Sequence, residues 1–84
     1  MNRDERHAEE LTRFAYWARR TAAERGLGMN QLLRRSALGQ GTFFAAMDGR
    51  GNPTSRTLSS IATALGVRLC DLLDPLPDDD DPED

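Results

Sequence analysis

The chain has 84 residues, of which 38% are hydrophobic, and a formal net charge of -3 at pH 7. A chain this short excludes a second domain and builds only a small core, since about 60% of its unfolded surface becomes buried. No run approaches the ~18 apolar residues of a membrane span, and the N-terminus MNRDERHAEE has no hydrophobic signal region, so we expect a cytoplasmic protein.

Charge is distributed unevenly along the chain. Residues 1–73 contain all eleven arginines and seven carboxylates, whereas residues 74–84 contain seven carboxylates and no base. We therefore predict two parts, a mildly basic domain over 1–73 and an acidic tail over 74–84. Every basic residue is arginine, which suits bidentate contacts to phosphates and base edges, although genome composition explains the bias equally well.

The first predicted helix covers residues 4–25, which contain no glycine or proline. Its apolar stripe recurs at helical spacing: Leu11, Ala15, Ala18 and Ala22. The aromatic residues Phe14, Tyr16 and Trp17 lie at angles that cannot all face one core. At least one of them is therefore expected to be half exposed.

Two short helices follow, over Met29–Ser36 and Gln40–Met47, with a break at Ala37–Gly39. The next segment, RGNPT, is predicted to be a loop, because proline blocks helix continuation at Asn52 and glycine permits positive φ.

A fourth helix starts at a cap on Thr54 or Ser55 and ends at Gly66. Its apolar residues have the most regular helical spacing in the chain: Leu58, Ile61, Ala62 and Leu65. A short fifth helix is predicted over Leu69–Leu73. The remaining DPLPDDDDPED is expected to be disordered, since it has three prolines and no large apolar residue after Leu76. The predicted class is all-α with five helices.

Two short helices joined by a tight turn have the geometry of a helix-turn-helix, whose second helix enters the major groove of DNA. The run MNQLLRRSALGQGTFFAAMDGRGNPTSRTLSSIATALGV resembles the core of the Cro/phage-repressor (XRE-type) family of transcriptional regulators. It is also similar to the family's small antitoxins, which share an M-x-Q-L start and a G-x-G-N-P loop. With the flanking helices, the resemblance covers about residues 8–73. It implies a five-helix, lambda-repressor-like DNA-binding domain in which helix 40–47 reads the major groove.

The resemblance gives Gln40 the role of reading an adenine edge, as glutamine does at this place in lambda-type repressors. The chemistry is sound, because an amide offers one donor and one acceptor to adenine. The residues expected to contact bases are Gln40, Gly41, Phe44 and Ala45. Hydrogen-bond readout on this face is sparse, so we expect specificity to depend also on DNA shape and methyl contacts.

The neighbouring phenylalanines are expected to differ in role. Phe43 falls where the family has an apolar residue that packs the two helices together, whereas Phe44 lies 100° round the helix. Three interpretations of Phe44 remain open: a contact to a thymine methyl, an apolar patch for a protein partner, or a ring folded over a neighbouring side chain.

Phosphate contacts are expected at helix N-termini and at the loop arginine. The candidates are Asn30, Gln31, Thr42, Arg50, Asn52 and Thr54, with the backbone acting at the first two. Ala37 departs from the family pattern, because it replaces the glycine usual in the turn. A positive φ there would cost about 1 kcal/mol.

These features predict a sequence-specific transcriptional regulator, a repressor that binds a palindromic operator in double-stranded DNA as a homodimer. The dimer contact is expected either around Trp17 or in residues 69–76. The alternative is a protein-interaction module, an antitoxin or adaptor, that binds a partner such as a toxin through Phe44 and the tail. The tail is either a solubilising terminus or a segment that folds back on the basic face and competes with phosphate.

Catalysis is not expected. His7 is the sole histidine and lies near the N-terminus, so neither a serine nor a cysteine nucleophile has a positioned partner. Cys70 is the sole cysteine and stands among apolar residues, so we expect it to be a small buried hydrophobic residue. We therefore expect no catalytic residue, no metal site and no cofactor.

Overall fold

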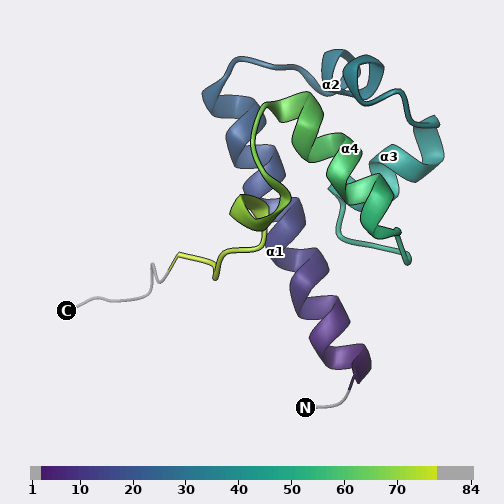
Figure 1. The fold of residues 1–84 in the computed structure, drawn as a ribbon, viewed down its shortest axis with the longest axis vertical. Coiled ribbons are helices and arrows are strands. Elements are labelled where there is room, and N and C mark those ends of the chain that lie inside the picture. Colours follow the sequence, from purple (N-terminus) through teal and green to yellow (C-terminus); the bar gives the residue numbers. More distant parts are fainter. Residues whose placement is uncertain (1–2, 78–84) are drawn as a thin grey trace.

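The computed structural model describes residues 3–77, which form helices and no strand (Figure 1). This confirms the all-α class. The elements in chain order are α1 (Arg3–Glu24), α2 (Met29–Ser36), α3 (Gln40–Met47), α4 (Ser55–Leu65) and the 3-10 helix η1 (Leu69–Leu72). None of the described helices combines the length and the apolar character needed to cross a bilayer.

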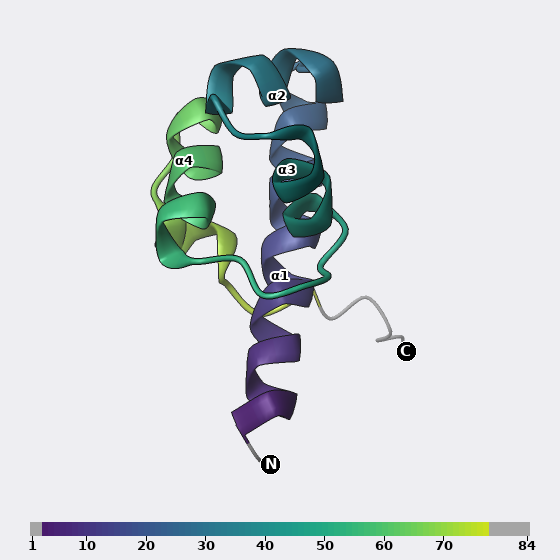
Figure 2. The ribbon, with the colours of Figure 1, turned by 90° about the vertical axis from the view of Figure 1, so that its right-hand side faces the viewer.

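The long helix α1 is the support on which the other elements pack. Its C-terminal half contacts α3, α4 and η1, and its first turns extend beyond them (Figures 1 and 2). α2 packs mainly on α4 and less on α3. α3 is consequently held between α1 and α4 at one side of the molecule, where Figure 2 shows it facing the viewer.

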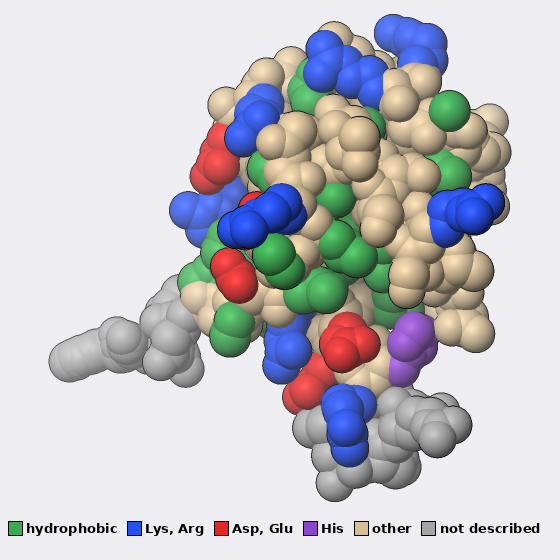
Figure 3. Space-filling model, viewed as in Figure 1, with side chains coloured by type: hydrophobic (Ala, Val, Ile, Leu, Met, Phe, Trp, Pro, Cys, Tyr) green, Lys and Arg blue, Asp and Glu red, His purple; other side chains and the backbone are tan. Residues whose placement is uncertain are grey.

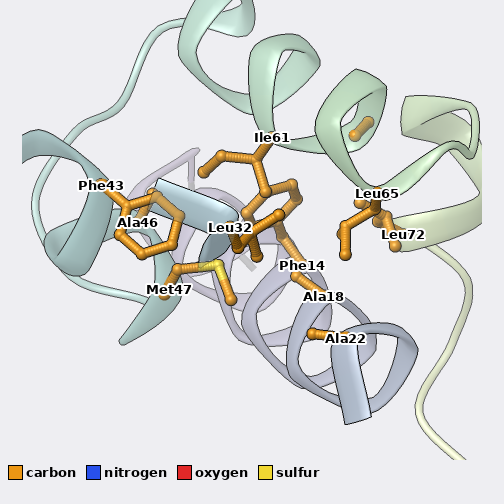
Figure 4. Packing of buried hydrophobic residues seen from close by; sticks show 11 residues of the cluster. Phe14, Ala18, Ala22, Leu32, Phe43, Ala46, Met47, Ile61, Leu65 and Leu72 are labelled. Atoms are coloured by element: carbon orange, nitrogen blue, oxygen red, sulfur yellow. The ribbon is translucent and has the colours of Figure 1, made fainter. Parts of the chain in front are cut away.

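The core forms where α1 meets the three shorter helices. Figure 4 shows the Phe14 ring at its centre, among side chains from α2, α3 and α4. The largest fully buried side chains are Phe14, Leu32, Phe43, Met47, Ile61, Leu65 and Leu72. Because each helix contributes at least one of them, burial of this cluster fixes the position of α3 relative to the rest of the fold.

The buried stripe of α1 differs from the predicted one at a single position. Leu11, Ala18 and Ala22 are buried as predicted, but Phe14 completes the stripe and Ala15 is only half-buried. Tyr16 is 39% exposed, which confirms that one of the three aromatic residues lies outside the core. The chain directly after α3 comes close to α1, since a Cβ on Gly49 would lie 3.4 Å from the carbonyl oxygen of Leu11 and 3.5 Å from the Ala15 Cβ.

The C-terminal segment differs from its prediction in three ways. Cys70, which was expected to be buried, is exposed. The expected fifth α-helix is a 3-10 helix of four residues, whose start is capped by a hydrogen bond from the Arg68 N–H to the Asp71 carboxylate. The predicted tail is also anchored at its beginning, because the Trp17 indole Nε1–H donates to the Asp74 carbonyl at 2.8 Å. A contact to α1 therefore exists beyond residue 73. Residues 78–84 of the predicted tail lie outside the described residues.

Ala37 adopts the left-handed conformation, with φ 60° and ψ 26°. We expect Ala37→Gly to raise the free energy of unfolding by about 1 kcal/mol, because glycine removes the Cβ clash that this conformation imposes. Urea unfolding followed by circular dichroism measures the change. Ala23→Gly, at an exposed helical position of α1, should instead lower stability by up to about 1 kcal/mol. If both variants had a lower free energy of unfolding, the expected backbone strain at Ala37 would be refuted.

Candidate nucleic-acid interface

The turn between α2 and α3 is tight and held by Ser36. The Ala37 N–H donates to the Arg34 carbonyl at 3.3 Å, which closes the last turn of α2. Ser36 is buried, and its Oγ donates to the Leu33 carbonyl at 2.8 Å and accepts a longer bond from the Leu38 N–H at 3.4 Å. Gly39 is extended, and α3 begins at the next residue. Two eight-residue helices are thereby joined through three residues.

α3 presents its N-terminal end to solvent. Phe43, Ala46 and Met47 are buried against the core, whereas Gln40 and Gly41 are exposed. This end points outward because the buried residues of α3 begin at Phe43, whereas Gln40, Gly41 and Thr42 before it are exposed.

The N-termini of α2 and α3 share a feature that our sequence analysis did not identify. Their N-cap residues, Gly28 and Gly39, provide no side chain to cap the first N–H groups, whereas Thr54 caps α4. Uncapped N–H groups at the positive end of a helix are suited to binding an anion. Both helices of the pair therefore keep backbone donors available at the ends predicted to meet phosphate.

A groove of about 450 Å³ runs between α3 and the following loop. It is lined by Gly41, Thr42, Ala45, Arg50, Asn52 and Pro53. Two residues predicted to contact bases and three predicted to contact phosphate thus line one surface. Gln40 is exposed at the adjoining end of α3.

Three predicted phosphate contacts lie outside this groove. Asn30 and Gln31 are exposed in the first turn of α2. The Thr54 hydroxyl accepts from the Thr57 N–H at 3.2 Å and donates to the Thr57 Oγ1, also at 3.2 Å. This hydroxyl therefore already serves as the cap of α4.

The paired phenylalanines have different environments. Phe43 is fully buried, which confirms its predicted place in the core. Phe44 is half-buried, and its ring packs edge-to-face on Phe43, with centroids 5.0 Å apart and planes at 84°. Of the three interpretations of Phe44, this packing favours a ring folded over its neighbour.

The residue that follows the C-terminal end of α3, Asp48, lies between two arginines. Asp48 accepts from Arg19 at 2.6 Å and from Arg50 at 3.1 Å. These hydrogen bonds lower the pKa of Asp48 below its ordinary value, and the bond from Arg50 contributes more than the bond from Arg19. Arg19 also donates through Nε to the Met47 carbonyl at 2.9 Å, so the network ties α3 to α1. Sequence patterns contained no signal for it, because Arg19 and Asp48 are far apart in the chain.

Positive charge predominates around the helix pair. Residues 29–68 contain five arginines and a single carboxylate, that of Asp48. In the view of Figure 3, acidic side chains gather over α1 and the C-terminal segment, and none is visible over α2 or α4. Among the residues that line the groove beside α3, Arg50 is the charged one, and it is paired with Asp48.

We expect Asp48→Asn to lower the melting temperature more at about pH 7 than at about pH 2. The two arginines lower the pKa of the folded carboxyl, so its stabilisation is present above the unfolded pKa and is lost as the pH falls through the folded pKa. Thermal unfolding at both pH values measures this difference. The control is Glu24→Gln, which breaks one exposed pair with Arg20 and should have a smaller effect at about pH 7. If Asp48→Asn lowered the melting temperature equally at both pH values, the stabilisation could not be assigned to the ionised Asp48 carboxylate.

No protein-family model, curated protein or solved structure matches the chain.

Proposed function

We propose that this protein is a sequence-specific DNA-binding transcriptional regulator, a repressor with the lambda-repressor-like fold of XRE-type helix-turn-helix proteins. The observation that supports the proposal most directly is the exposed N-terminal end of α3 beside a groove lined by Arg50 and Asn52. A helix of this kind fits the major groove of B-DNA, which is about 12 Å wide. In the proposed complex α3 enters the groove and α2 crosses the phosphate backbone.

Base recognition in this complex begins at Gln40. Its amide can pair with adenine N7 and N6, and it stands at the exposed start of α3. Gly41 adds no side chain, so the α3 backbone can approach the bases closely, and the Ala45 methyl in the groove can contact a thymine methyl. Phe44 is the weakest member of the proposed set, since its ring already packs on Phe43.

Phosphate binding is assigned mainly to backbone groups and to one arginine. The uncapped N-termini of α2 and α3 offer N–H donors near Asn30, Gln31 and Thr42. Arg50 is 63% exposed in its side chain and paired with Asp48, so a phosphate would compete with that carboxylate for the guanidinium. The competition makes the contact weaker than that of a free arginine.

We further propose that the protein binds a palindromic operator as a homodimer, because one short helix-turn-helix buries little DNA surface by itself. The two segments considered for the dimer contact lie together, since Trp17 bonds to Asp74 and a groove between α1 and the C-terminal segment is lined by Thr12, Pro75 and Leu76. A single interface can therefore use both.

Selection of bound sites from random duplex DNA tests the proposal. A palindromic consensus supports a dimeric regulator, and the association constant for that site should fall with salt with a slope near -0.9 per neutralised phosphate. Equally weak binding to every sequence would reject the regulator and favour the protein-interaction module.

Truncation tests the acidic tail. Removing residues 78–84 deletes six of the seven tail carboxylates and spares Asp74, to which Trp17 is bonded. If the tail competes with phosphate, affinity for DNA should rise at low salt and remain unchanged at high salt, where charges are screened. Fluorescence anisotropy at the two salt concentrations measures this. Unchanged affinity at both would identify the tail as a solubilising terminus.

A further inference from the structure

A further cleft lies between α2 and α4 and shares no lining residue with the groove beside α3. Its volume is about 290 Å³. It is lined by Arg35, Ser36, Arg56, Ser59, Ser60 and Thr63. Every side chain around it is thus either a guanidinium or a hydroxyl.

The fold sets these side chains in place. On α4 the lining residues are at positions 56, 59, 60 and 63, which follow helical spacing and form one polar stripe. The opposite face of α4 is buried through Ile61 and Leu65, and α2 is anchored by Leu32. Ser36 is only 6% exposed and closes the cleft toward the core. Packing of α2 and α4 on the core and on each other therefore sets the walls of the cleft.

The charges in the cleft have no counter-ion within the part of the chain that the structure describes. Neither Arg35 nor Arg56 forms an ion pair there, whereas five other arginines do: Arg13, Arg19, Arg20, Arg50 and Arg68. The nearest acidic residue in sequence, Asp48, already binds two arginines.

The hydroxyl groups beside these arginines are also available. Among residues 3–77, Ser59, Ser60 and Thr63 make no side-chain hydrogen bond to one another or to a neighbour. A guanidinium has five donors and no acceptor, and each hydroxyl adds one donor. The cleft therefore offers many donors to an acceptor that the described chain does not supply.

We propose that this cleft binds a phosphate group, clamped by Arg35 and Arg56 and further bound by the hydroxyls of α4. Phosphate fits better than a carboxylate, because two guanidinium forks and three hydroxyls supply more donors than two carboxylate oxygens accept. The forked geometry of arginine matches phosphate oxygens in a bidentate manner. The group comes either from the DNA backbone, in which case the site rests on the function proposed above, or from a free phosphorylated small molecule, in which case it is independent of that function.

The test is an NMR titration of the full chain with inorganic phosphate, with chloride replaced so that ionic strength stays constant. Saturable shifts are expected at the amides of Ser59, Ser60 and Thr63. The double variant Arg35→Gln, Arg56→Gln should weaken binding about ten-fold or more, since charge-assisted contacts are lost at both positions. Arg34→Gln is the matched control, because Arg34 is an exposed arginine of the same helix outside the cleft, and it should leave the shifts unchanged.

Two further titrations identify the source of the phosphate. If it is the DNA backbone, duplex DNA should shift the same amides, and the double variant should lower DNA affinity and the salt slope. If it is a free ligand, a mononucleotide should saturate the cleft at a lower concentration than inorganic phosphate, with DNA affinity unchanged in the double variant. Circular dichroism verifies that the variants are folded. Shifts spread evenly over all arginine-bearing surfaces, or no shifts at these amides with any of the three probes, would overturn the proposal.

Discussion

Replacing Phe14 with alanine is expected to lower the free energy of unfolding by about 3–5 kcal/mol. Phe14 is fully buried at the centre of the core, where it meets side chains from α2, α3 and α4 (Figure 4). Truncation removes the apolar surface of a whole ring and leaves a cavity that four helices cannot all close. Since domains are stable by only about 5–15 kcal/mol, a core this small should lose much of its stability.

Urea unfolding, followed by circular dichroism and by the fluorescence of Trp17, measures the effect. Tyr16→Ala is the matched control, because it removes an aromatic ring of similar size from the outer face of the same helix, where Tyr16 is 39% exposed. The control should lose about 1 kcal/mol or less. Similar losses for the two variants would show that Phe14 is not the central residue of the core.

Gln40→Ala should have the largest effect on recognition. We expect it to lower affinity for the selected operator by about 1–3 kcal/mol and to relax specificity at one base pair. Affinity for unrelated DNA should remain nearly unchanged, since phosphate contacts supply most nonspecific binding. The stability of the fold should also be unaffected, because Gln40 is exposed and makes no side-chain hydrogen bond to another described residue.

Fluorescence anisotropy with the operator, and with every single-base variant of it, measures this specificity. Gln31→Ala is the control, because it removes the same amide from the exposed first turn of α2, where the proposed contact uses the backbone. Affinity for the operator should therefore change little in this variant. A uniform loss across all sequences for Gln40→Ala would assign Gln40 to phosphate, and no loss would remove it from the interface.

Helix boundaries near the interface were predictable because their signals are local. α2 and α3 have the predicted bounds, Met29–Ser36 and Gln40–Met47, and Thr54 caps α4 as one of the two candidates. A cap or a regular apolar spacing depends on residues within one or two turns. The 3-10 form of η1 was missed, since four residues before Pro75 are too few to show a period.

The composition of the candidate site was only partly predictable. A resemblance of sequence suggested which residues to consider, and the fold brought five of them together in one groove. It also added Asp48, which binds the proposed phosphate contact Arg50 and links it to Arg19. No local pattern pairs these residues, because their contact exists only after α3 has packed on α1.

By itself, the sequence determined the helical class, the positions of the short helices and the concentration of arginine away from the acidic tail, since all three depend on neighbouring residues and on composition. Tertiary structure decided that Phe14 and not Ala15 completes the core, that Trp17 holds Asp74, and that two arginines share the α2–α4 cleft. The physical reason is that burial and hydrogen bonding between distant segments depend on how the helices pack, and helical spacing leaves several faces nearly equivalent until that packing selects one.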